Sequence, residues 1–152
     1  MREPLVSRVL GISLYIIFAL GIFGTVTLPF MLEFYIGLFR DAYYLEPGYR
    51  AFIIPFMICV AIPGLWIILD MLRMLRSIPQ GPFIMRNVRA LGRMGVILLV
   101  IAALFLVKCF VYFTFLTMAC TVLFLVCGFF AFTLSNLFGQ AVIYKEENDL
   151  TI

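Results

Sequence analysis

Residues 70–93 read DMLRMLRSIPQGPFIMRNVRALGR and separate two long apolar blocks of the chain. Only 12% of all residues are charged, so a cluster of charge is a strong local signal here. The stretch also contains Pro79, Gly81 and Pro82, residue types that end helices or begin them. It is therefore predicted to be a polar connection between two apolar helices. Five arginines fall within it: Arg73, Arg76, Arg86, Arg89 and Arg93.

The composition of the whole chain indicates a lipid environment. Of its 152 residues, 65% are apolar, and the mean hydropathy is +1.17. Soluble domains are usually about 45–50% apolar. The formal net charge is only +3, and the basic residues flank apolar blocks instead of forming a continuous basic surface. Direct nucleic-acid binding by this chain is therefore not expected.

Four apolar blocks are long enough to cross a membrane. The first, about residues 9–32, would reach about 36 Å as a helix, against a hydrocarbon core of about 30 Å. The last apolar stretch, residues 94–144, contains Lys108 as its only charge and is about twice the needed length, so it must turn back near residues 113–117. We predict an all-α integral membrane bundle of four transmembrane helices in a single domain, 1–152. The predicted spans are 9–32, 51–69, 94–112 and 118–143.

The distribution of basic residues predicts the orientation in the membrane. Arg2 and Arg8 precede the first span, the central stretch contributes five arginines and Lys145 follows the last span. The connection between the first two spans has only Arg40 and Arg50. By the positive-inside rule, both termini and the central connection are predicted to be cytoplasmic. The cytoplasmic segments would be a loop at 70–93 and a tail at 144–152.

The cytoplasmic loop is predicted to contain an amphipathic helix that begins at Pro82. Three arginines, Arg86, Arg89 and Arg93, recur on one face of it. Such a stripe suits either anionic lipid headgroups or a docking surface for a cytoplasmic partner.

The acidic tail offers a second partner for these arginines. Glu146, Glu147 and Asp149 give the tail a charge opposite to that of the loop, and we hypothesise a weak latch between them. The candidate partner or lipid contacts are Arg73, Arg76, Arg86, Arg89, Arg93, Glu146, Glu147 and Asp149.

Polar residues inside the apolar blocks are the other candidates. Lys108 is predicted to extend its amine to the outer interface, or else to pair with Glu33 or contact a substrate. Asn136 and Gln140 share one face of the last helix, where they would act as hydrogen-bonding glue between helices or line a substrate site. The candidate intramembrane polar site is thus Lys108, Asn136 and Gln140.

The second span carries two features of its own. Pro55 and Pro63 each remove a backbone hydrogen bond and predict a bent helix. Asp70 at its end has Arg73 three residues later, which predicts an ordinary surface ion pair.

Residue types that support catalysis are scarce. The chain has no histidine, and its four cysteines lie in apolar runs without a Cys-x-x-Cys pair. No nucleophile and base, paired carboxylates or phosphate-binding loop can be recognised. We therefore predict no metal, no cofactor and no enzymatic activity.

Two motifs resemble a known family. They are PQGPFIMRNVRAL at residues 79–91 and the ending KEENDLTI at 145–152. With the order of four spans, they resemble the bacterial membrane family called domain of unknown function 2975. The matching positions are Gly81, Pro82, Phe83, Asn87, Glu147, Asn148, Asp149, Leu150 and Thr151. The resemblance implies a multi-pass protein of the bacterial cytoplasmic membrane with no established activity, often encoded beside small helix-turn-helix regulators.

Two functions remain open from the sequence. The first is a non-enzymatic regulator or sensor whose basic loop and acidic tail engage a cytoplasmic regulatory protein. The second is a small transport or immunity component with a groove around the second helix and Lys108. Membrane lipids are expected partners in both cases, and a homo-oligomer is compatible with either.

Overall fold

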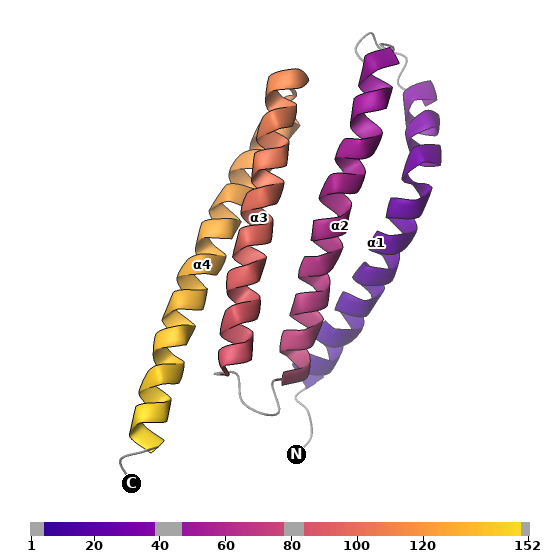
Figure 1. Ribbon diagram of the computed structural model, residues 1–152. Helices are drawn as coiled ribbons and strands as arrows, with labels where there is room; N and C mark the ends of the chain where they lie inside the picture. The colour runs from indigo at the N-terminus through magenta and orange to yellow at the C-terminus, as the bar shows by residue number, and fades with distance from the viewer. Residues whose placement is uncertain (1–4, 39–46, 78–83, 150–152) are drawn as a thin grey trace.

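The described residues form four α-helices (Figure 1). The computed structural model describes residues 5–38, 47–77 and 84–149. The helices are α1 (Leu5–Leu38), α2 (Pro47–Ser77), α3 (Met85–Val111) and α4 (Phe115–Asp149). Each is long and apolar enough to cross a membrane, which confirms the predicted class and number of spans. Even α3, the shortest with 27 residues, is about 40 Å long and exceeds a hydrocarbon core of about 30 Å.

The helices are longer than the predicted spans, and the predicted loop at 70–93 is mostly helical. α2 continues to Ser77, and α3 begins at Met85, nine residues before the predicted start of the third span. The amphipathic segment is therefore the first part of α3 and not a separate element. Arginine, leucine and methionine favour helices, and no proline or glycine occurs between Asp70 and Ser77. The predicted start at Pro82 lies outside the described residues.

The remaining boundaries differ in the same direction. α1 extends beyond 9–32 on both sides, and α4 continues through most of the predicted tail to Asp149. A helix does not stop where the hydrocarbon core ends, because its hydrogen bonds continue equally well into the headgroup region. Hydropathy locates the apolar part of each helix and leaves its polar ends unassigned.

A tight turn joins α3 and α4 at residues 112–114. The backbone N–H of Tyr112 donates to Lys108 O at 2.8 Å and closes α3, and Met118 N–H donates to Thr114 O at 3.1 Å at the start of α4. The predicted turn region, 113–117, overlaps this one, although α4 already begins at Phe115. A connection this short makes α3 and α4 antiparallel neighbours.

Hydroxyl groups on lipid-facing helices are satisfied within their own helix. Ser13 donates to Val9 O at 2.9 Å, and Thr25 donates to Gly21 O at 2.7 Å. This arrangement hides polar groups where neither water nor another helix is available. α2 continues without interruption through Pro55 and Pro63, and the bend predicted there stays a prediction.

The four helices lie side by side in chain order. In the described part of the chain, α1 packs against α2, α2 against α3 and α3 against α4, and no other pair approaches closely. Figure 1 shows this row. The predicted bundle is thus a row, in which the described helices contact only their neighbours in sequence. The α3–α4 contact is by far the most extensive, so the molecule consists of two helical hairpins joined along a narrower seam between α2 and α3.

Small residues bring α3 and α4 close together. A Cβ atom added at Gly95 would lie 3.2 Å from the backbone oxygen of Gly128, and one added at Gly128 would lie 2.7 Å from Leu99 Cδ2. Ile101 and Ala102 of α3 are almost fully buried. Helices in lipid associate through such close packing, because apolar burial alone gains nothing there.

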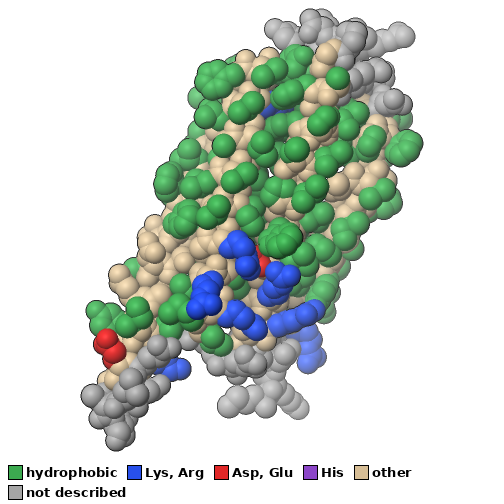
Figure 2. Space-filling model, viewed as in Figure 1, with side chains coloured by type: hydrophobic (Ala, Val, Ile, Leu, Met, Phe, Trp, Pro, Cys, Tyr) green, Lys and Arg blue, Asp and Glu red, His purple; other side chains and the backbone are tan. Residues whose placement is uncertain are grey.

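Large apolar side chains cover the remaining surface. Phe30, Phe110 and Phe115 are 77%, 85% and 83% exposed. Figure 2 shows apolar side chains over most of one face of the molecule, with basic residues gathered at one end. A soluble monomer rarely exposes so much contiguous apolar surface, so lipid is the natural solvent for this face.

One end of the molecule contains the start of α1, the end of α2, the start of α3 and the end of α4 (Figure 1). This is also the end that carries the arginines. Four spans place both ends of the chain on the same side of the membrane, as expected. The side on which they lie stays a prediction.

Candidate functional site

A buried carboxylate organises the arginine-rich end. Asp70 of α2 has no exposed surface, and Arg93 of α3 grips it with two hydrogen bonds, Nε to Oδ2 and Nη2 to Oδ1, each 2.7 Å long. Arg73 of α2 adds a third bond to Oδ1 at 2.9 Å. Asp70 and Arg73 do form the predicted ion pair, but the prediction that it lies on the surface was wrong, because Asp70 is buried. The principal partner is Arg93, and the pair connects two helices.

A second polar contact closes the same seam about two turns further along α2. The Ser77 hydroxyl of α2 donates to Asn87 Oδ1 of α3 at 2.7 Å and lies 2.6 Å from its own Met74 O. Both side chains are buried. Asp70, Met74 and Ser77 follow one another at spacings of four and three, so one face of α2 presents all of them to α3. Asn87 is the only motif position of residues 81–87 that the structure describes, and there it joins α3 to α2.

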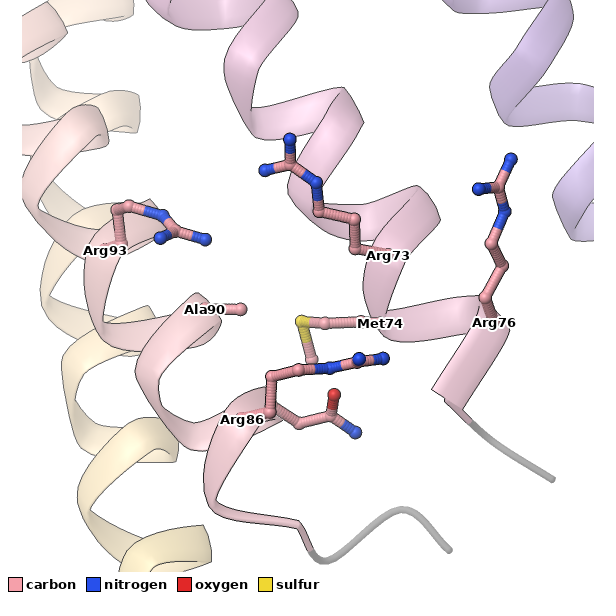
Figure 3. Close-up of a pocket in the computed structure, with 7 residues that line it drawn as sticks. Arg73, Met74, Arg76, Arg86, Ala90 and Arg93 are labelled. Atoms are coloured by element: carbon pink, nitrogen blue, oxygen red, sulfur yellow. The ribbon is translucent and has the colours of Figure 1, made fainter. Parts of the chain in front are cut away.

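A cavity of about 390 Å³ opens beside these contacts. Figure 3 shows that α2 and α3 contribute its walls, with the side chains of Arg73 and Arg93 extending toward each other and Arg86 reaching from α3 toward α2. We call this the arginine cavity. Its lining residues are Arg73, Met74, Arg76, Arg86, Asn87, Ala90 and Arg93.

The cavity brings together four of the five predicted arginines. One face of α3 carries three of the lining residues, because Ala90 and Arg93 follow Arg86 after about one and two helical turns. Arg89 is exposed and does not line the cavity, so the predicted stripe divides between two faces. Arg76 extends toward α1, donates to the Tyr15 hydroxyl and places its guanidinium carbon 5.7 Å from the centre of that ring.

The chemistry of the arginine cavity is that of an anion site. Four arginines line it, whereas one carboxylate, Asp70, balances them in the described ion pairs. Guanidinium groups offer paired N–H donors that match carboxylate or phosphate oxygens. Among the described residues, no group of three or more His, Cys, Asp or Glu side chains could hold a metal ion.

The acidic tail is only partly described. Glu147 and Asn148 are exposed on the last turns of α4. The side chains of Glu146 and Asp149 lie outside the described residues, as do Leu150, Thr151, Gly81, Pro82 and Phe83 of the motif. The latch between tail and loop stays a prediction.

Lys108 lies near the opposite end of α3, where its amine contacts a polar side chain of α4. Its amine donates to Thr117 Oγ1 of α4 at 3.0 Å and sits 5.6 Å from the centre of the Phe56 ring of α2. It therefore links three helices, a role that was not among the three predicted for it. The alternative partner, Glu33, has a side chain outside the described residues.

Near the arginine-rich end, Ser135, and not Asn136 or Gln140, provides a hydrogen bond between α3 and α4. Its hydroxyl donates to the backbone oxygen of Val88 at 2.9 Å, and its side chain is buried. Asn136 and Gln140 are exposed on α4. The prediction that these two amides join the helices was wrong, because the buried face of α4 is the one that carries Ala131, Ser135 and Val142.

We expect Ser135→Ala to reduce the free energy of unfolding by about 1 kcal/mol, because the Val88 carbonyl loses its additional donor within the contact between α3 and α4. Asn136→Ala is the matched control, one position away and exposed to lipid, and should change this energy by less than about 0.3 kcal/mol. Reversible unfolding in mixed detergent micelles measures both. Equal effects of the two substitutions would contradict the assignment of Ser135 as the interhelical contact.

Four membrane-crossing helices with a basic cavity at one end define a multi-pass membrane protein. Its family is also established: the chain belongs to the family described as "Protein of unknown function (DUF2975)", whose model matches residues 9–152. The resemblance drawn from the two motifs is thereby confirmed. No curated protein and no solved structure matches the chain.

Proposed function

We propose that this protein is a non-enzymatic regulator or sensor of the bacterial cytoplasmic membrane, which acts through its arginine-rich end. Its partner would be a cytoplasmic protein with an acidic segment, such as a small helix-turn-helix regulator. The observation that carries the proposal is the surplus of positive charge around one buried carboxylate (Figure 2). By the positive-inside rule this end faces the cytoplasm.

Arg89 is the residue best placed to meet such a partner. It is exposed on α3 near the start of the helix, and it neither lines the arginine cavity nor pairs with Asp70. A charged group in this position attracts acidic surfaces over about a Debye length and adds to the rate of encounter more than to the final affinity. Contacts of this kind suit a partner that binds and leaves.

The transport alternative has less support. It needs a groove at Lys108, but the Lys108 amine already donates to Thr117 and lies over the Phe56 ring. The polar groups that a substrate would use there are occupied by one another.

Photocrosslinking in native membranes tests the proposal. A photoreactive residue at position 89 should capture a cytoplasmic protein through an acidic segment, and the yield should fall several-fold when the salt is raised to about 0.5 M. The same residue at position 106, where Leu106 is exposed on the apolar part of α3, is the control and should capture no such protein. Capture of lipid alone at position 89 would contradict the proposal that a cytoplasmic protein binds this end. Capture of a small molecule at position 108 would favour the transport alternative.

A further inference from the structure

The arginine cavity combines a basic lining with an apolar one. Arginine side chains carry its charge, while Met74 and Ala90 and the methylene stems of the arginines supply apolar walls. Figure 3 shows Met74 and Ala90 between the guanidinium groups. A ligand that fits both must have an anionic group and an apolar part.

The depth of the cavity points to a lipid. Arg93 is the last charged residue of α3 before Lys108, 15 residues and about 22 Å further along the helix. The cavity thus lies where the hydrocarbon core begins, and α2 and α3 carry exposed apolar residues such as Met71 and Val96 within three residues of its lining arginines. Basic cavities between transmembrane helices at this depth suit anionic headgroups, with the acyl chains along the apolar helix faces.

The charge of the cavity requires an anion with more than one acceptor oxygen. Arg73 and Arg93 already give N–H groups to Asp70. Four arginine charges against one carboxylate charge leave three positive charges among the described lining residues and their ion pairs. A phosphate diester accepts from several guanidinium groups at once. A volume of about 390 Å³ is at the lower end of the range for small-molecule sites, about 300–1,000 Å³, and suits one headgroup.

We propose that the arginine cavity binds the headgroup of one anionic phospholipid. The phosphate would lie among Arg73, Arg86 and Arg93, with Arg76 at the side of the cavity that faces α1, and the acyl chains would follow the apolar faces of α2 and α3. Such a lipid contacts both hairpins and holds them together across their narrow seam. The inference goes beyond the proposed function, because it needs only a membrane around the helices and holds whether or not a protein binds at Arg89.

Native mass spectrometry of the purified full-length protein tests the lipid site. The protein is taken from nanodiscs that contain phosphatidylglycerol and phosphatidylcholine in equal amounts. The wild type should retain one phosphatidylglycerol in preference to phosphatidylcholine. Arg76→Gln combined with Arg86→Gln should weaken this retention about 30-fold, because each cation near an anionic membrane contributes about a fivefold change in affinity. Neither residue belongs to the Asp70 ion pairs, so the α2–α3 seam should stay intact, and Arg76→Gln alone shows what the lost contact with Tyr15 does to folding.

Arg89→Gln is the matched control for charge. It removes a cation from the same end of α3 without changing the cavity lining, and retention should stay within about twofold of the wild type, because its side chain does not reach the bound phosphate. If the double variant does not fold, Arg86→Lys keeps the charge, loses the paired donors and should still weaken retention several-fold.

Three results would overturn the proposal. Equal losses in Arg89→Gln and in the cavity variant would mean a diffuse attraction to the membrane and no site. Stabilisation by inorganic phosphate in detergent, equal to that by the lipid, would mean a site for free phosphate. Retention of a polyglutamate peptide with no preference for phosphatidylglycerol would mean a site for an acidic protein segment.

Discussion

Gly95→Leu is expected to separate α3 from α4 and to lower the free energy of unfolding by at least about 3 kcal/mol. A Cβ atom at position 95 already lies 3.1 Å from a ring carbon of Phe132 and 3.2 Å from the backbone oxygen of Gly128. The ring can turn aside, but the backbone oxygen moves only if the whole of α4 moves. Three further carbons then leave no arrangement that keeps the helices at their present separation.

Energy transfer between dyes on the two helices measures this effect. Positions 96 and 137 suit the dyes, because Val96 and Leu137 are both about half exposed, and the four native cysteines are first replaced by alanine. Gly64→Leu is the matched control, since a Cβ atom there meets nothing within 4 Å. It should leave stability unchanged or improve it by up to about 0.8 kcal/mol through helix propensity. If both substitutions had the same effect, the close packing at Gly95 would not hold the hairpin together.

Asp70→Asn is expected to open the seam between α2 and α3. The carboxylate is fully buried and accepts three hydrogen bonds from two arginines, whose side chains are 49% and 54% exposed. Removing one partner of a fully buried pair costs about 3–5 kcal/mol. Because both arginines reach water at their exposed sides, the expected loss here is smaller, about 2 kcal/mol.

Substitutions of the two arginines distinguish their contributions. Arg93→Gln removes both hydrogen bonds that α3 donates to Asp70. It should lower the free energy of unfolding nearly as much as Asp70→Asn does. Arg73→Gln removes one bond from the same helix and should cost only about 0.5 kcal/mol. Distances between spin labels on α2 and α3 should widen with Asp70→Asn and Arg93→Gln but not with Arg73→Gln. A wider seam with Arg73→Gln alone would show that the assignment of Arg93 as the principal partner is wrong.

Hydropathy and charge predicted the four helices because both depend on long runs of sequence. A stretch of 51 residues with Lys108 as its only charge can fit a membrane only by turning back, and the turn was placed close to 112–114. The same reasoning could not place the ends of the helices. Arginines and leucines continue a helix as readily outside the hydrocarbon core as inside it.

The contacts across the helices were harder to predict. Asp70 and Arg93 are 23 residues apart, and their meeting depends on the register of α2 against α3, which no local spacing reveals. One signal was present: Asp70 is the only acidic residue between Glu46 and Glu146. A lone carboxylate at the end of an apolar helix needs a buried cation, and arginines on both sides were the available ones.

The buried face of α4 illustrates a second difficulty. α4 is apolar nearly all round, so its hydrophobic pattern indicates no particular side. The useful signal was steric: Ala131, Ser135 and Gly139 recur every four residues, the spacing of small side chains that lets two membrane helices approach. Asn136 and Gln140 attracted attention through their polarity but lie on the neighbouring, exposed face.

The row of helices has a mechanical consequence. A molecule whose helices meet only their neighbours in sequence can be taken apart from its ends. A force applied to the start of α1 should extract α1 and α2 from the bilayer as one early step, after the seam with α3 yields. α3 and α4 should leave later and together at a higher force, because a three-residue turn and their tight packing bind them as one unit. A single-molecule pulling trace should therefore contain two main rupture events and not four.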